Sequence, residues 1–205
     1  MSNELIHLIV RGRNQSFHDE VARLREQEEP ISIEGATFTN LNLQRFRFDG
    51  VDMTNVEFDG CTLDECVFNG CNVEGTYITG TNLLGCVFEK LSGEGFALDT
   101  CTMTKGSFSG GELRSCEWSD TSMTAMTFDG TLFPEALWER ITLTECTLED
   151  LTIEEGELSY VTLRQGQIKR FELKECDVSH CYGVKLDKDA LPEGFKVKSG
   201  ARRQL

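Results

Sequence analysis

The chain has 205 residues, with 20 Lys or Arg against 35 Asp or Glu, so its formal net charge at pH 7 is −15. This charge argues against a nucleic acid or an anionic membrane surface as partner, because both would repel the protein, and it favours a protein partner with a basic surface. With 39% hydrophobic residues, no stretch long enough to span a membrane and no signal-peptide pattern at the start, the sequence predicts a folded, cytoplasmic protein.

Residues 1–30 predict a helical cap. Leu5, Leu8 and Ile9 form one apolar stripe, and Ser16 with Asp19 matches a weak capping box at the start of a second amphipathic helix. Pro30 then ends that helix. We expect this segment to cover one end of the structure that follows.

From Ile31 onward the chain divides into pentads, beginning ISIEG, ATFTN, LNLQR, FRFDG. The third residue is apolar in 29 of the 30 pentads between 31 and 180, with Gly93 as the exception, and neither the first nor the third residue is ever charged. Two inward residues separated by one outward residue indicate a short extended segment. The Gly, Asn and Asp that follow favour a turn. The pattern predicts a solenoid of short strands, since helical steps of five residues advance about 140° and would scatter the apolar groups.

The number of sides follows from a second period. Phenylalanine recurs every twenty residues, at Phe48, Phe68, Phe88, Phe108 and Phe128. Four pentads therefore make one turn, and the array predicts about 7.5 coils, or a rod about 36 Å long at the usual strand spacing of about 4.8 Å. Residues 186–205 lose the pattern and are expected to form a C-terminal cap followed by a flexible tail, SGARRQL.

Pentads such as TNLLG, CNVEG, VDMTN and CTLDE resemble the pentapeptide repeat family over residues 31–185. The resemblance implies an all-β solenoid, a right-handed quadrilateral β-helix with the central apolar residue inward. Five pentads depart from the family pattern through a large first residue, and we expect swollen or reshaped coils there: Leu41, Phe46, Phe96, Met126 and Phe171.

Nine cysteines are the most conspicuous candidates for chemistry, and all of them take the small first position of a pentad. We therefore interpret them as buried core residues; a Cys66–Cys86 bond would form only outside a reducing compartment. No C-x-x-C pair exists, and the register points His180 outward but Cys176 and Cys181 inward, which does not suit shared metal ligation. With no phosphate-binding loop and no nucleophile–base set, the sequence predicts no enzyme, no cofactor and no metal site.

Charge is distributed unevenly among the four sides. We number the faces by their pentads, so that face 1 is centred on Ile33, face 2 on Phe38, face 3 on Leu43 and face 4 on Phe48, with each series continuing every twenty residues. Up to residue 180, face 1 sums to −8, face 2 to −7, face 3 to 0 and face 4 to −1. A solvated surface that only keeps the protein soluble is the simpler interpretation, but solubility does not require two adjacent sides.

Duplex DNA of the same length as the rod carries roughly 21 charges, which is comparable with the charge on this half-surface. The family resemblance implies a function for it, because the quinolone-resistance and albicidin-resistance pentapeptide proteins mimic DNA and occupy DNA gyrase. A type II topoisomerase, either gyrase or topoisomerase IV, is the partner so implied, and the array lacks the loops that several resistance proteins insert. The contacts would be made by thirteen carboxylates: Glu34, Asp52, Glu57, Asp59, Glu74, Glu94, Asp99, Glu112, Glu117, Asp120, Glu135, Glu154 and Glu155.

An alternative function is a protein-interaction scaffold, effector or adaptor that binds an unrelated partner through the neutral faces. Five outward apolar residues could mark such a contact or a homodimer interface: Val67, Val87, Tyr77, Leu132 and Leu137.

Overall fold

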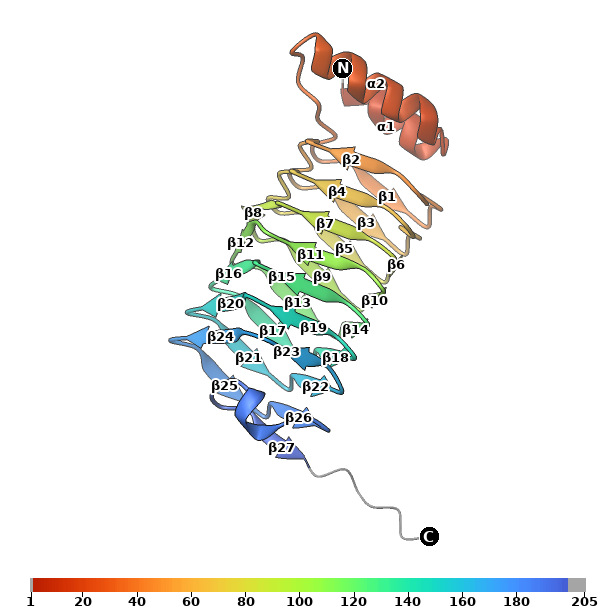
Figure 1. Cartoon of the computed structure of the whole chain (residues 1–205). Coiled ribbons are helices and arrows are strands. Elements are labelled where there is room, and N and C mark those ends of the chain that lie inside the picture. The colour runs from red at the N-terminus through yellow and green to blue at the C-terminus, as the bar shows by residue number, and fades with distance from the viewer. Residues whose placement is uncertain (1, 199–205) are drawn as a thin grey trace, which may run out of the picture.

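Four parallel sheets form the sides of a rod in the computed structural model, which describes residues 2–198. Each pentad contributes one short strand or bridge, and the chain then moves to the next side, so residues twenty apart become neighbours (Figure 1). This parallel β-solenoid of about seven turns, with two short helices at the N-terminus, confirms the expected fold class.

The strands distribute over the faces as the pentad count predicts. Face 1 holds β8 (Ser92–Glu94), β12 (Glu112–Arg114), β16 (Leu132–Pro134), β20 (Leu151–Glu154) and β24 (Phe171–Lys174). Face 2 holds β1 (Thr37–Thr39), β3 (Glu57–Asp59), β5 (Tyr77–Thr79), β9 (Ala97–Asp99), β13 (Glu117–Ser119), β17 (Leu137–Glu139), β21 (Glu157–Ser159) and β25 (Asp177–Ser179).

Face 3 holds β6 (Asn82–Leu84), β10 (Thr102–Thr104), β14 (Ser122–Thr124), β18 (Thr142–Thr144), β22 (Thr162–Arg164), β26 (Tyr182–Val184) and β27 (Lys196–Lys198). Face 4 holds β2 (Arg47–Asp49), β4 (Val67–Asn69), β7 (Val87–Glu89), β11 (Ser107–Ser109), β15 (Thr127–Asp129), β19 (Thr147–Glu149) and β23 (Gln167–Ile168). Isolated bridges such as Ser32 to Asp52 extend faces 1 and 3 toward the N-terminus.

The corners of the rod lie at the fifth residue of the pentads, which has a left-handed backbone conformation in all of them between residues 31 and 180 except the one that ends at Arg170. Asn40 has φ of 55°, Glu65 of 58° and Gly75 of 60°. This conformation costs most residues about 1–2 kcal/mol, and glycine and asparagine adopt it most readily. The physical requirement of the corner explains why glycine is the most frequent residue there.

Aromatic side chains stack along the axis of the rod. The ring centroids of Phe68 and Phe88 are 4.9 Å apart, those of Phe88 and Phe108 are 4.5 Å apart, and Phe108 and Phe128 follow at 5.4 Å. Each coil thus buries its central side chain mainly against the same position of the coils above and below. Packing of this kind ties the identity of a residue to that of its neighbours twenty positions away.

Large first-position residues leave the strand register unbroken. Met126, for example, is 1% exposed, and its coil neighbours in the same column are Gly106 and Cys146. A small residue above and below offsets the large one, because coil stacking places them in contact. The register therefore never slips, as the strand pairs on both sides of Phe96 also confirm.

Gly93 is the one central residue without an apolar side chain between residues 31 and 180. A Cβ atom there would lie 2.6 Å from the backbone nitrogen of Glu74, and φ is 150°. The backbone of β8 therefore approaches the previous coil too closely for any larger residue.

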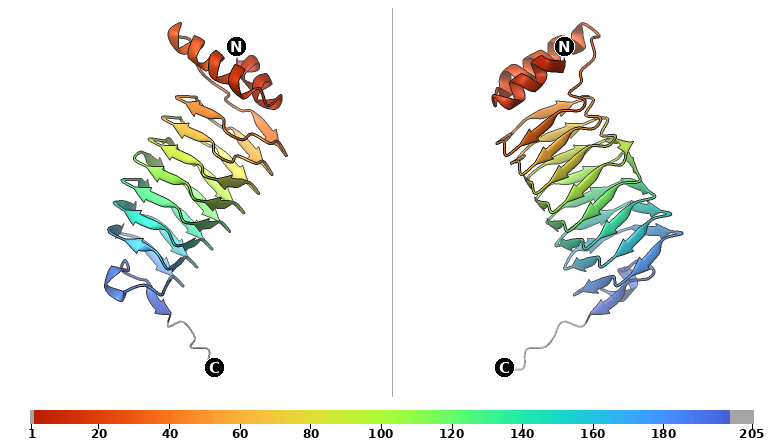
Figure 2. Two further views of the ribbon diagram at one scale, coloured as in Figure 1. Left: turned by 45° about the vertical axis from the view of Figure 1, so that its right-hand side comes forward. Right: turned by 180° about the vertical axis from the view of Figure 1, so that it is seen from behind.

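The N-terminal cap consists of α1 (Ser2–Val10) and α2 (Asn14–Glu26), which lie across the first coil (Figure 2). The ring of Phe17 packs edge-on at 5.4 Å from both Phe46 and Phe48. The predicted capping box is wrong: α2 begins two residues before Ser16, and its N-cap residue Arg13 makes no side-chain capping bond. Asn14 is the first residue of α2, and its side-chain NH2 group donates to the carbonyl oxygens of Gln44 and Arg45 on the rod.

At the other end, the pattern persists one pentad beyond residue 180, and a short 3-10 helix, η1 (Lys188–Ala190), precedes β27, which pairs with β26. Gly183 occupies a central position, and a Cβ atom there would lie 2.5 Å from Leu191. A leucine from the C-terminal segment therefore fills the space that the missing side chain leaves. The expected flexible tail, residues 199–205, lies outside the described residues.

We predict that Phe108→Ala lowers the free energy of unfolding by about 3–5 kcal/mol, because it opens a cavity in the middle of the phenylalanine stack. The neighbouring outward substitution Ser107→Ala should change it by less than about 0.5 kcal/mol. Urea unfolding followed by circular dichroism measures both. A loss below about 1 kcal/mol for Phe108→Ala would contradict the importance of the stack.

Candidate functional site

Faces 1 and 2 share an edge along the rod, and the thirteen carboxylates predicted from the sequence all lie on these two faces. All of their side chains are exposed or half-buried, because they occupy the second, fourth or fifth residue of a pentad, which point outward or form the corner. The fold therefore brings them together on one half of the surface. The carboxylates differ in whether a basic residue pairs with them.

Nearer the C-terminus, ion pairs engage four of the thirteen carboxylates, whereas Glu117 and Glu155 belong to no ion pair among the described residues. Arg114 contacts Glu135 at 2.8 Å and Glu112 at 3.2 Å. Two guanidinium nitrogens of Arg140 face Asp120, with Nε–Oδ1 at 2.6 Å and Nη2–Oδ2 at 2.7 Å. These pairs are exposed, so each contributes little to stability, but each removes a free negative charge from the surface.

Lys174 pairs with Glu154 at 2.7 Å in the same way. In most of these pairs the partners are about twenty residues apart, one directly above the other. An acidic and a basic residue one turn apart in the sequence therefore indicate an ion pair. The sequence contains this signal, but it was not used to predict which carboxylates are paired.

Between Glu34 and Asp99, by contrast, faces 1 and 2 contain no Lys or Arg. Two of the carboxylates there have neutral partners. Asp52 accepts hydrogen bonds from Thr54 and Asn72. Asp99 accepts one from Ser119 at 2.6 Å, which is the main cause that lowers the pKa of Asp99. Such bonds orient the carboxylates without cancelling their charge.

We call the unpaired carboxylates in this part of the rod the open acidic surface. It consists of Glu34, Asp52, Glu57, Asp59, Glu74, Glu94 and Asp99. Within the described residues none of them belongs to an ion pair. Faces 3 and 4 differ, because acids there face bases, as Arg45 with Glu65 at 2.8 Å and Lys169 with Glu149 at 2.6 Å.

The cysteines point into the rod. The thiol of Cys66 donates to the carbonyl oxygen of Leu43 at 2.8 Å, and that of Cys86 donates to Leu63 at 2.8 Å. Burial raises the pKa of the Cys66 thiol far above its ordinary value and that of Cys71 to about 12. A thiol that stays protonated is a poor nucleophile and a poor metal ligand. All nine are free thiols.

Cys176 is the one cysteine that is not fully buried. It is half-buried and lines a shallow depression of about 420 Å³ at the C-terminal end of the rod, together with Leu173, Val178 and Glu193. Among residues 2–198, no group of three or more His, Cys, Asp or Glu is placed to hold a metal ion.

The outward apolar residues do not gather on the neutral faces. Tyr77 and Leu137 are exposed but lie on acidic face 2, and half-buried Leu132 lies on face 1. Only Val67 and Val87 are on face 4, adjacent to one another and half-buried. The register thus separates the residues that the sequence interpretation grouped.

The family model of pentapeptide repeats matches residues 32–70 in eight copies. A trypsin-treated variant of QnrB1, a plasmid-mediated fluoroquinolone resistance protein, is similar in structure, with a TM-score of 0.56 and 15% identity over 80% of this chain and 85% of that one. HetL, a pentapeptide repeat protein involved in heterocyst differentiation regulation from the cyanobacterium Nostoc sp. strain PCC 7120, gives a TM-score of 0.30 and 10% identity over 79% and 90% of the two chains. No curated protein matches the sequence.

At these identities the likeness to QnrB1 establishes a common fold and nothing more. The fold and the twenty-residue register define a four-sided β-solenoid of five-residue repeats. Residues 32–70 match the pentapeptide repeat family, and the same twenty-residue register continues beyond them to β26. None of the helices described is both long and apolar enough to cross a membrane.

We predict that at pH 8 a thiol reagent of disulfide-exchange type modifies Cys176 in the native protein before any other cysteine. The other eight thiols are buried, and burial raises the pKa of Cys86 to about 12, so they carry almost no thiolate at that pH. Cys176→Ser should abolish the fast phase, and Cys86→Ser should leave it unchanged. Fast modification of several thiols in the folded protein would contradict this.

Proposed function

We propose that this protein is a non-catalytic binding rod whose acidic half-surface takes the place of duplex DNA on the basic DNA-binding surface of a type II topoisomerase, DNA gyrase or topoisomerase IV. Binding there would modulate the enzyme's activity or protect it from inhibitors. The observation that carries the proposal is the open acidic surface, where seven carboxylates follow one another along two adjacent faces with no cation among them.

Geometry supports this assignment. The rod presents charge at a repeat of one coil, about 4.8 Å, along a straight axis, and DNA likewise presents charge at short regular intervals. QnrB1, which shares the fold, is a fluoroquinolone resistance protein, and this motivates gyrase as the first partner to test. The strand register continues without an inserted loop from the first coil to β26, so binding through the faces is favoured over contacts made by loops.

The direct test is a supercoiling assay with added protein. We expect the protein to alter gyrase or topoisomerase IV activity at micromolar concentration, and the effect to weaken as salt is raised, since the attraction is electrostatic. Lack of any effect on either enzyme at moderate salt would overturn the assignment of the partner.

A matched pair of variants separates mimicry from general acidity. The first neutralises four members of the open acidic surface, Glu57→Gln, Asp59→Asn, Glu74→Gln and Glu94→Gln. The second makes an equal change on faces 3 and 4, with Asp64→Asn, Glu89→Gln, Asp129→Asn and Glu145→Gln.

We predict that the first variant binds the topoisomerase roughly tenfold or more weakly, because four exposed charge contacts of about 0.5 kcal/mol each sum to about 2 kcal/mol, and about 1.4 kcal/mol corresponds to tenfold. The second variant should bind within about threefold of the wild type. Equal losses would indicate general acidity, and full binding by the first variant would support a scaffold that uses other surfaces.

A further inference from the structure

No coil precedes the first coil, so the backbone groups on its N-terminal side have no strand to pair with. In the later coils, the backbone N–H of the second residue of a pentad typically donates to the carbonyl oxygen of the first residue of the corresponding pentad in the coil before, as Glu57 does to Ala36 at 2.9 Å and Val67 to Phe46 at 2.9 Å. Strand β2 is the first strand of its sheet, so Arg47 has no such acceptor from a preceding strand in the described chain. An unpaired edge of this kind loses hydrogen bonds and recruits other strands.

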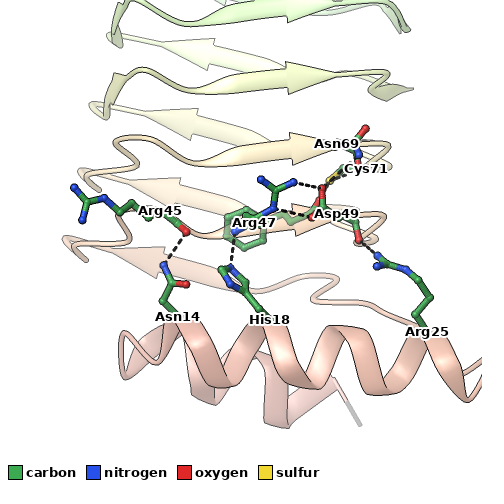
Figure 3. A network of polar contacts seen from close by, with 9 residues as sticks. Asn14, His18, Arg25, Arg45, Arg47, Asp49, Asn69 and Cys71 are labelled. Carbon is green, nitrogen blue, oxygen red and sulfur yellow. Dashed lines mark hydrogen bonds and ion pairs between the residues drawn. The ribbon is translucent and has the colours of Figure 1, made fainter.

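A histidine of α2 supplies the acceptor that Arg47 would otherwise find in a preceding strand. The backbone N–H of Arg47 donates to Nε2 of His18 at 3.0 Å (Figure 3). Two other side chains of the same helix satisfy carbonyl groups at this edge: Asn14 donates to Arg45 at 2.7 Å, and Arg25 donates to Asp49 at 2.5 Å. The cap is therefore attached by hydrogen bonds in addition to the apolar contacts of Phe17.

Of these three side chains, His18 is the one whose hydrogen bond depends on its protonation state. Asn14 and Arg25 donate hydrogen bonds and keep the same protonation state at any ordinary pH, whereas His18 accepts a hydrogen bond and is titratable. Accepting at Nε2 requires the neutral imidazole with its hydrogen on Nδ1. Protonation would place one N–H against another and add a positive charge beside Arg47.

The surroundings of His18 favour the neutral form. Its ring is half-buried, 6.0 Å from the ring of Phe17 and 6.4 Å from that of Phe46. The charged groups that act on it are Arg47 and Asp49 from β2 and Asp19 from its own helix. Burial and Arg47 lower the pKa of His18 below 6.5, and the two carboxylates only partly oppose them.

From this geometry we propose that His18 is a pH-sensitive latch, which holds the N-terminal helical cap on the first coil when it is neutral and releases it when it is protonated. Release uncovers the apolar end formed by Phe46 and Phe48 together with the unpaired edge of β2. The exposed end then favours association with other strands, including those of a second copy of the chain.

The direction of the pH dependence follows from proton linkage. The latched state binds fewer protons than the released state, because its imidazole has the lower pKa. The attachment is therefore fully present above pH 6.5 and weakens as the pH falls below it. Between 6.5 and the lower pKa of the latched imidazole, the opening equilibrium should rise by up to about tenfold per pH unit.

Hydrogen exchange of the Arg47 amide, corrected for the intrinsic pH dependence of exchange, measures this opening in the full chain. We expect the corrected opening of the wild type to rise as the pH falls from 7.5 to 5. His18→Gln keeps an acceptor without a titrating group, so its opening should be independent of pH. The control His7→Gln removes an exposed imidazole of α1 and should behave as the wild type does.

An acid response in His18→Gln equal to that of the wild type would overturn the proposal. Because glutamine could fail to reach Arg47, a second measurement on the wild type decides independently of the variant. The NMR titration of the His18 ring must give a pKa below 6.5, and the opening of the Arg47 amide must follow that titration. An amide that stays protected after His18 is protonated would also overturn the latch.

Discussion

Backbone hydrogen bonds between successive coils hold the rod together, and nearly every other property depends on them. They place each residue directly over its counterpart in the next coil, so the interior becomes a set of columns of like side chains. Phenylalanines stack, a small residue accommodates a large neighbour, and acids meet bases one turn later. A change at one position is therefore felt first by two positions in the sequence, twenty residues before and twenty after.

The same ladder determines how charge is displayed. Its regular rise turns the outward residues of a pentad into straight rows, and whether a row stays charged depends on what lies one coil away. Arg140 above Asp120 cancels a charge, whereas Asn72 beside Asp52 only orients one. The open acidic surface thus results from the absence of basic residues in the first coils of faces 1 and 2, while the total of −15 does not predict where free charge remains.

A ladder also has ends, and they require different solutions. At the N-terminus, side chains of α2 imitate the missing strand, and His18 makes that imitation dependent on protonation. At the C-terminus the chain itself continues as β26 and β27, with Leu191 filling the space over Gly183. The sequence predicted that helices cover the first end and that a C-terminal segment covers the other, but not which side chains make the contacts, because caps lie outside the repeat and follow no period.

The sequence alone determined the class of fold, the number of sides, the inward cysteines and the two acidic faces, because all of these follow from a five-residue period that never slips. Only the tertiary structure decided which carboxylates remain unpaired, which apolar residues share a face, and which side chains close the first coil. Those properties depend on distances between residues in different coils or outside the repeat, where a contact such as His18 with Arg47 joins positions 29 residues apart.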